Sequence, residues 1–94
     1  MKVNEAVRMA VTHVSSLFEH EKLTNIGLEE VEYDPEHHEW TVTVGFSRPW
    51  DYPTSTTTIA ALAYQSEPPK RSYKIIRIND DNQEIVAMKN YSMA

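Results

Sequence analysis

The feature that most constrains the fold is the run WTVTVGF, from Trp40 to Phe46. Its first residue and every second residue after it are large and apolar, and two threonines and a glycine stand between them. Successive side chains of a strand point to opposite faces, so this run predicts a strand with one apolar and one polar face. Such a strand needs a second layer of structure on its apolar face.

The N-terminal residues predict a helix that supplies this layer. From Val3 to Leu17 apolar residues recur at spacings of three or four, which indicates an amphipathic helix from about Asn4 to Glu21. Asn4 is the expected N-cap, because its side chain can accept a hydrogen bond from the first turn. Gly27 is expected to mark the place where the chain leaves the helix.

Three further strands are predicted, over Ile26–Tyr33, Tyr73–Ile78 and Glu84–Lys89. They follow the helix in an order that suits a meander, in which each strand pairs with the next. The predicted fold class is therefore α+β, with one N-terminal helix packed on a four-stranded antiparallel sheet. A chain of 94 residues is expected to form a single domain, residues 1–94.

Local irregularities are also predicted in this sheet. Leu28 and Val31 are three residues apart instead of two or four, so a β-bulge is expected near residues 29–30. The polar segments DPEH (34–37) and NDDN (79–82) are typical of turns.

Residues 47–72 form a long insert between the second and third strands. Connections of this length inside a compact domain are usually functional, disordered, or contain an element of their own. The apolar stretch from Ile59 to Tyr64 is sufficient for a short helix or a strand extension.

The start of this insert, SRPWDYP, carries large aromatic and charged residues where a hairpin turn would carry small polar ones. Aromatic residues and arginine are enriched in the cores of protein interfaces. We therefore predict a partner-binding site made of Arg48, Trp50, Asp51, Tyr52 and Tyr64. The alternative is that Trp50 and Tyr52 hold the loop against the protein's own core while Arg48 and Asp51 form a local ion pair.

Charge and composition exclude several classes of partner. The formal net charge is −5. Residues 1–46 carry three cations and nine anions, for −6, and residues 47–94 carry six and five, for +1. Phosphate backbones are repelled by the first half, so nucleic acid is not an expected partner.

The chain has no cysteine and no apolar run of about 20 residues, so we expect a cytoplasmic protein without disulfides or a membrane partner.

No catalytic residue, metal ligand or cofactor is predicted. His37 and His38 neighbour acidic residues, but adjacent residues of a strand face opposite sides and cannot easily chelate one ion. His13 and His20 are seven residues apart, about 10.5 Å along a helix, which is too far for one metal. With two glycines, the sequence contains neither a recognisable nucleophile elbow nor a glycine-rich phosphate loop.

A basic run lies on and before the predicted third strand and consists of Lys70, Arg71, Lys74 and Arg77. These cations can meet the glutamates of segment 29–32, either within the fold or across a dimer. A bound anion is the alternative partner.

The last third of the chain, RSYKIIRINDDNQEIVAMKNY, is similar to the closing hairpin of PepSY-type domains. In that family a strand with an aromatic start leads to an Asp-containing turn, a Gly-Glu pair and a short apolar strand. The matching residues are Tyr73, Asp80, Asp81, Glu84, Ile85 and Val86, whereas Gln83 stands where the family has glycine. The resemblance covers about two thirds of the chain and omits the insert, and the cystatin-like helix-on-sheet shape is equally compatible. It implies an inhibitory or protein-binding role and carries over no functional residue.

Together these observations predict a non-enzymatic protein-interaction or inhibitory module. The partner is another protein or a second copy, bound through segment 47–66 or through a sheet edge. One alternative is a small-ligand-binding or enzymatic cystatin-like cone, with a pocket between helix and sheet reached by His13, Tyr33, Trp40 or Tyr73. Another is an acidic immunity-type protein that neutralises a basic toxin.

Overall fold

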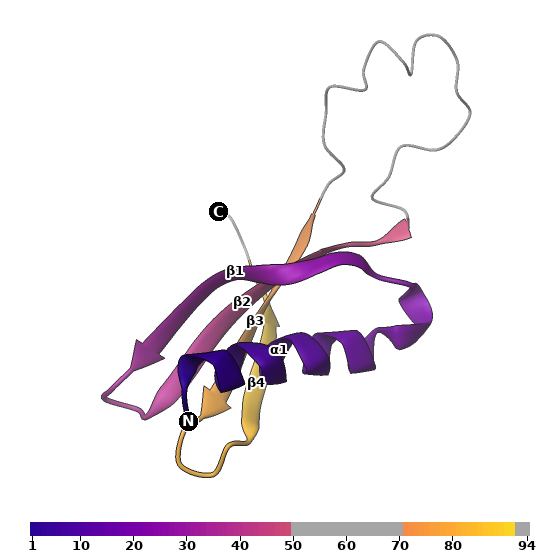
Figure 1. The fold of residues 1–94 in the computed structure, drawn as a ribbon. Coiled ribbons are helices and arrows are strands. Elements are labelled where there is room, and N and C mark those ends of the chain that lie inside the picture. The colour runs from indigo at the N-terminus through magenta and orange to yellow at the C-terminus, as the bar shows by residue number, and fades with distance from the viewer. Residues whose placement is uncertain (50–70, 92–94) are drawn as a thin grey trace, which may run out of the picture.

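The fold was obtained as a computed structural model, which describes residues 1–49 and 71–91. Its elements are α1 (Val3–Leu17), the 3-10 turn η1 (Glu19–Glu21), β1 (Thr24–Asp34), β2 (Glu39–Ser47), β3 (Ser72–Asn79) and β4 (Ile85–Asn90). Each strand pairs antiparallel with the next, in the order β1-β2-β3-β4, and α1 lies across one face of the sheet (Figure 1). The predicted α+β fold is confirmed. The short helix or strand extension predicted near residues 59–64 lies outside the described residues.

The core lies between α1 and the centre of the sheet. Its fully buried residues are Ala6, Ala10 and Val14 of α1 and Val42, Val44, Phe46, Ile76 and Ile78 of β2 and β3. The apolar face predicted for the central strand is therefore the face that meets the helix. Burial of each large apolar side chain contributes about 1.5–3 kcal/mol, and the small alanines let the helix backbone approach the sheet.

Both ends of the helix differ from the prediction. The N-cap is Lys2, whose carbonyl oxygen accepts hydrogen bonds from the N–H groups of Glu5 and Ala6. Asn4 lies within the first turn, where the backbone is already helical, so it cannot cap. The α-helix ends at Leu17, and the chain reverses at Lys22, which adopts the left-handed conformation with φ 53°. The reversal predicted at glycine is thus made by a lysine, and Gly27 lies inside β1.

The pairing of β1 with β2 contains the predicted bulge. Leu28 pairs with Val44 and Glu30 pairs with Thr43, so Glu29 is the extra residue. A second shift in register lies between Thr24 and Gly27. Bulges strengthen the local twist of a strand and interrupt its hydrogen-bonding pattern, so β1 is an irregular edge of the sheet.

Both predicted turns are present. Asp34 Oδ1 accepts hydrogen bonds from the backbone N–H groups of Glu36 and His37, at 2.9 and 3.2 Å. Asn79 Oδ1 accepts equivalent bonds from residues 81 and 82 in the second turn. This second turn closes at Gln83, which has φ 57°. The position at which Gln83 replaces glycine in the PepSY pattern therefore has a backbone conformation that favours glycine.

Replacing Gln83 with glycine is expected to raise the free energy of unfolding by up to about 1 kcal/mol. A left-handed residue with a Cβ costs about 1–2 kcal/mol, and glycine offsets part of that gain through its greater chain entropy when unfolded. Urea unfolding monitored by circular dichroism measures the change, with Gln83→Ala as the control that keeps the Cβ. Equal stability of the glycine and alanine variants would contradict this account.

Candidate functional site

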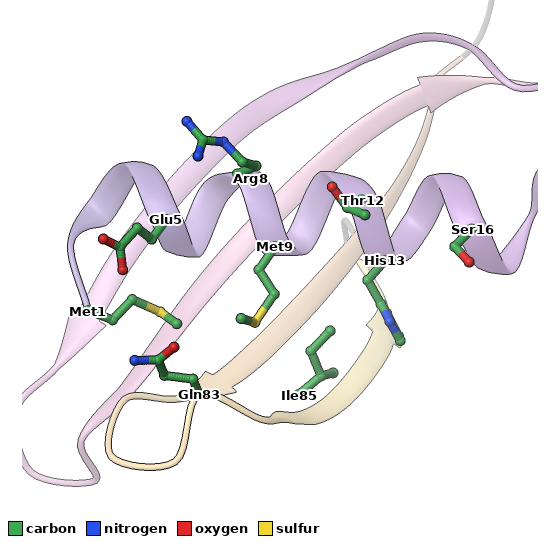
Figure 2. Close-up of a pocket in the computed structure, with 9 residues that line it drawn as sticks. All are labelled: Met1, Glu5, Arg8, Met9, Thr12, His13, Ser16, Gln83 and Ile85. Carbon is green, nitrogen blue, oxygen red and sulfur yellow. The ribbon is translucent and has the colours of Figure 1, made fainter.

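A groove lies between α1 and the start of β4. It has a volume of about 590 Å³. Figure 2 shows Met9 and His13 directed from α1 toward β4, where Ile85 points back toward the helix. Met1 and Gln83 close the end of the groove near the N-terminus. An apolar floor with a few polar side chains at the rim is typical of binding grooves.

Helix geometry explains this composition. Glu5, Met9 and His13 are spaced by four residues, so they lie in one row along α1. The adjacent row of Ala6, Ala10 and Val14 is buried against the sheet. The main contacts of α1 are with β1, β2 and β3, which leaves β4 beyond the helix. The groove is the space between the helix row of Glu5, Met9 and His13 and the strand β4.

The strand that borders the groove has an open edge. β4 is last in the sheet order, and its outer side pairs with no strand among residues 1–49 and 71–91. The N–H of Tyr91 donates to the carbonyl oxygen of Tyr73, at 3.3 Å, which identifies a hydrogen-bonded pair. Such pairs alternate along an antiparallel ladder, so Lys89 also bonds to β3, whereas the N–H and C=O groups of Met88 and Asn90 point outward.

The two edges of the sheet are chemically different. β1 is interrupted by two register shifts and carries glutamates at 29, 30 and 32, which are features that discourage another strand from pairing. β4 carries one charge, Lys89, beside apolar residues that include Val86, 48% exposed. Of the two edges, β4 is therefore the one suited to pairing with an added strand.

Of the predicted partner-binding residues, the structure describes Arg48. Its guanidinium lies over the rings of Phe18 and Phe46, 5.3 and 5.4 Å from their centres, and the side chain is half-buried. Lys74 lies over the Phe18 ring from β3, and burial, followed by the charge of Arg48, lowers the pKa of Lys74. Arg48 thus packs on the protein's own core. Trp50, Asp51, Tyr52 and Tyr64 lie outside the described residues.

The basic run meets acidic residues inside the fold. Arg71 donates to Glu29 at 2.9 Å, and this pair crosses β2 above Gly45, which has no side chain to obstruct it. Arg77 donates through Nε and Nη2 to the two carboxylate oxygens of Glu39, at 3.1 and 3.3 Å. The prediction that these cations can meet the glutamates of segment 29–32 within the fold holds for Arg71, whereas Arg77 uses a glutamate of β2.

The pocket residues proposed from sequence do not come together. His13 lines the groove, whereas Trp40 and Tyr33 contact each other, with ring centres 4.8 Å apart. Both donate to the Asp80 carboxylate, Trp40 Nε1 at 3.1 Å and the Tyr33 hydroxyl at 3.5 Å. Tyr73 packs edge-on against Tyr91 at the other end of β3. Met9 and Ile85 line the groove but were not predicted from the sequence. The spacing of four residues between Met9 and His13 was a signal that could have identified Met9.

Asp80 is the basis of a pH prediction. The α-amino group of Met1, 3.1 Å away, and then the Trp40 indole lower the pKa of Asp80 below its ordinary value of 3.8. A carboxyl group with a lowered folded-state pKa stabilises the fold above its unfolded pKa, and this contribution is lost as the pH falls through the folded value. Wild type should therefore exceed Asp80→Asn in stability at pH 5–6, and the difference should shrink toward pH 2–3. Urea unfolding across this range measures it, and a difference independent of pH would contradict the assignment.

A cluster of possible metal ligands lies in the turn between β1 and β2. One ligand atom from each of Asp34, Glu36 and His37 falls within 4.8 Å of the others. The turn itself accounts for these positions, because the Asp34 carboxylate accepts two backbone N–H groups and contacts His37 Nδ1 at 2.7 Å. The hydrogen bond from His37 also lowers the pKa of Asp34. We therefore assign the cluster to turn stabilisation.

Comparison with known proteins gives no match to a family model, to a curated protein or to a solved structure. Within residues 1–49 and 71–91, no helix has both the length and the apolar character that crossing a bilayer requires.

Proposed function

We propose that this protein is a non-enzymatic protein-interaction module that binds an extended segment of its partner along β4. The observation that carries the proposal is a groove of about 590 Å³ bordered on one side by a helix and on the other by an open edge strand. Addition of a strand to a sheet edge is a recurring mode of peptide recognition. In that mode backbone hydrogen bonds provide affinity, and pockets for alternate side chains provide specificity.

The described residues supply both components. The outward N–H and C=O groups of Met88 and Asn90 can bond to the backbone of an added strand. Alternate side chains of that strand would point toward α1, where Met9 and Ile85 form an apolar surface. Methionine is flexible and polarisable, so such a surface adapts to different side chains.

The test compares Met88→Pro with Met88→Ala. Both variants lose the thioether, but only proline removes the outward N–H, and it leaves the inward bonds of β4 to β3 intact. A peptide selected from a random library against the wild-type protein should bind the proline variant about tenfold more weakly than the alanine variant. Binding of this peptide to the wild-type protein should also slow hydrogen exchange of the Met88 and Asn90 amides. Equal affinity for the two folded variants, or protection confined to other strands, would remove the proposal.

The size of the groove also favours a second candidate, binding of a small ligand beside His13. Clefts of about 300–1,000 Å³ are typical of such sites. A thermal-shift screen with metabolites distinguishes the two functions. A small ligand should raise the melting temperature of wild type and Met88→Pro equally, because it does not need the strand edge.

A further inference from the structure

A second hollow lies on the face of the sheet opposite α1. It has a volume of about 240 Å³ and is lined by Glu29, Glu30, Thr43, Tyr73 and Tyr91. These residues come from β1, β2 and β3 and from the position that follows β4, so the hollow exists only because the sheet is assembled. Its lining combines two carboxylates with two tyrosine side chains and a threonine. We call it the tyrosine–glutamate notch.

The strand register explains its shape. Glu30 pairs with Thr43 across β1 and β2, and Tyr73 pairs with Gly45 across β2 and β3. Glu30 and Tyr73 therefore flank β2 on opposite sides, two strand spacings apart and offset by two residues along the strands, which is about 11–12 Å at the backbone. The Glu29 carboxylate and the Arg71 guanidinium lie over Gly45 beside the hollow, and Thr43, 8% exposed, forms its floor. Tyr91 supports the Tyr73 ring edge-on, with ring centres 5.9 Å apart.

The two carboxylates of the notch differ in their ion pairing. Glu29 is paired with Arg71 at 2.9 Å. Glu30 is exposed and, in the part of the chain that the structure describes, makes no ion pair and no side-chain hydrogen bond. Glu32 lies two residues further along the same strand, and the whole chain has a net charge of −5. The uncompensated charge in the lining of the notch is therefore that of the Glu30 carboxylate, and Tyr73 lines the same hollow.

We propose that the tyrosine–glutamate notch binds a cationic side chain, a guanidinium or an ammonium group, from a basic protein partner. A cation between a carboxylate and a tyrosine ring gains both an ion pair and a cation–π contact. The Arg71–Glu29 pair is an internal example of a guanidinium beside the same hollow. The notch is separate from the groove between α1 and β4. The proposal for the notch does not depend on the function proposed for that groove.

The first experiment is an NMR titration of the wild-type protein with the amides of N-acetylarginine, N-acetyllysine and N-acetylcitrulline. The arginine derivative, the lysine derivative or both should shift the amide signals of Thr43 and Tyr73 in a saturable way. The neutral citrulline derivative should not. The pair of cations separates guanidinium from ammonium recognition, and binding of either supports the proposal. Absence of saturable shifts with both cations overturns it.

The second experiment uses a matched pair of variants, Glu30→Gln and Glu32→Gln, which change the net charge equally. Glu30→Gln should weaken binding of the cation about three- to tenfold, whereas Glu32→Gln should leave it within about twofold. Tyr73→Leu, with its fold checked by the same spectra, should weaken binding to a similar degree as Glu30→Gln. Equal weakening by the two glutamine variants would show a general charge effect and would overturn the site.

Discussion

Replacing Phe46 with alanine is expected to lower the free energy of unfolding by about 3–5 kcal/mol. Phe46 is fully buried at the end of β2, and its ring stacks on Phe18 with centres 6.0 Å apart. The guanidinium of Arg48 covers the same two rings. The substitution therefore leaves a cavity below Arg48 and removes the contact that holds the end of α1 on the sheet. A domain of this size has a total stability of about 5–15 kcal/mol, so the loss is a large part of it.

Urea unfolding measures this loss, with Phe46→Leu as the control because leucine fills most of the volume. The leucine variant should lose less than half as much as the alanine variant. If Phe46→Ala costs under about 1 kcal/mol, the ring is not a core residue and the packing of α1 on β2 is wrong.

Ile76→Ala is expected to cost about 2–5 kcal/mol, and Ile75→Ala under about 1 kcal/mol. The two isoleucines are neighbours on β3, but Ile76 faces the helix and is fully buried, whereas Ile75 faces the other side and is half-buried. Ile76 stands between Val42 and Met88 in the sheet. Its truncation therefore creates a cavity in the centre of the core. Neighbouring side chains cannot easily move to fill this cavity.

This pair of variants also tests the register of β3. Because side chains alternate with a period of two, a shift of one residue would exchange the roles of the two isoleucines. Equal losses, or a larger loss at Ile75, would contradict the register and with it the position of the tyrosine–glutamate notch. Both variants are compared with wild type by urea unfolding at the same pH.

The candidate sites were less predictable than the fold. The sequence predicted a binding site in the insert, with Arg48 as a contact, and in the structure Arg48 lies over the rings of Phe18 and Phe46. The sequence also suggested a pocket between helix and sheet reached by four residues, and of these His13 lines the groove. The apolar floor was not foreseen, because Met9 and Ile85 are far apart in sequence and nothing in either segment indicates that they face each other. The notch was also missed, since its five residues come from three strands and the position after β4, which are far apart in the sequence.

Local patterns were sufficient for the elements of this protein. The alternation around Val42 and Val44, the spacing of apolar residues in α1 and the polar turn segments determined which residues form strands, helix and turns, because these signals act over a few residues. The bulge near Glu29 was visible for the same reason. Only the tertiary structure decided the helix ends, where Lys22 takes the role expected of a glycine. It alone also placed α1 over β1 to β3, which leaves β4 open, since that position depends on packing between segments distant in the chain.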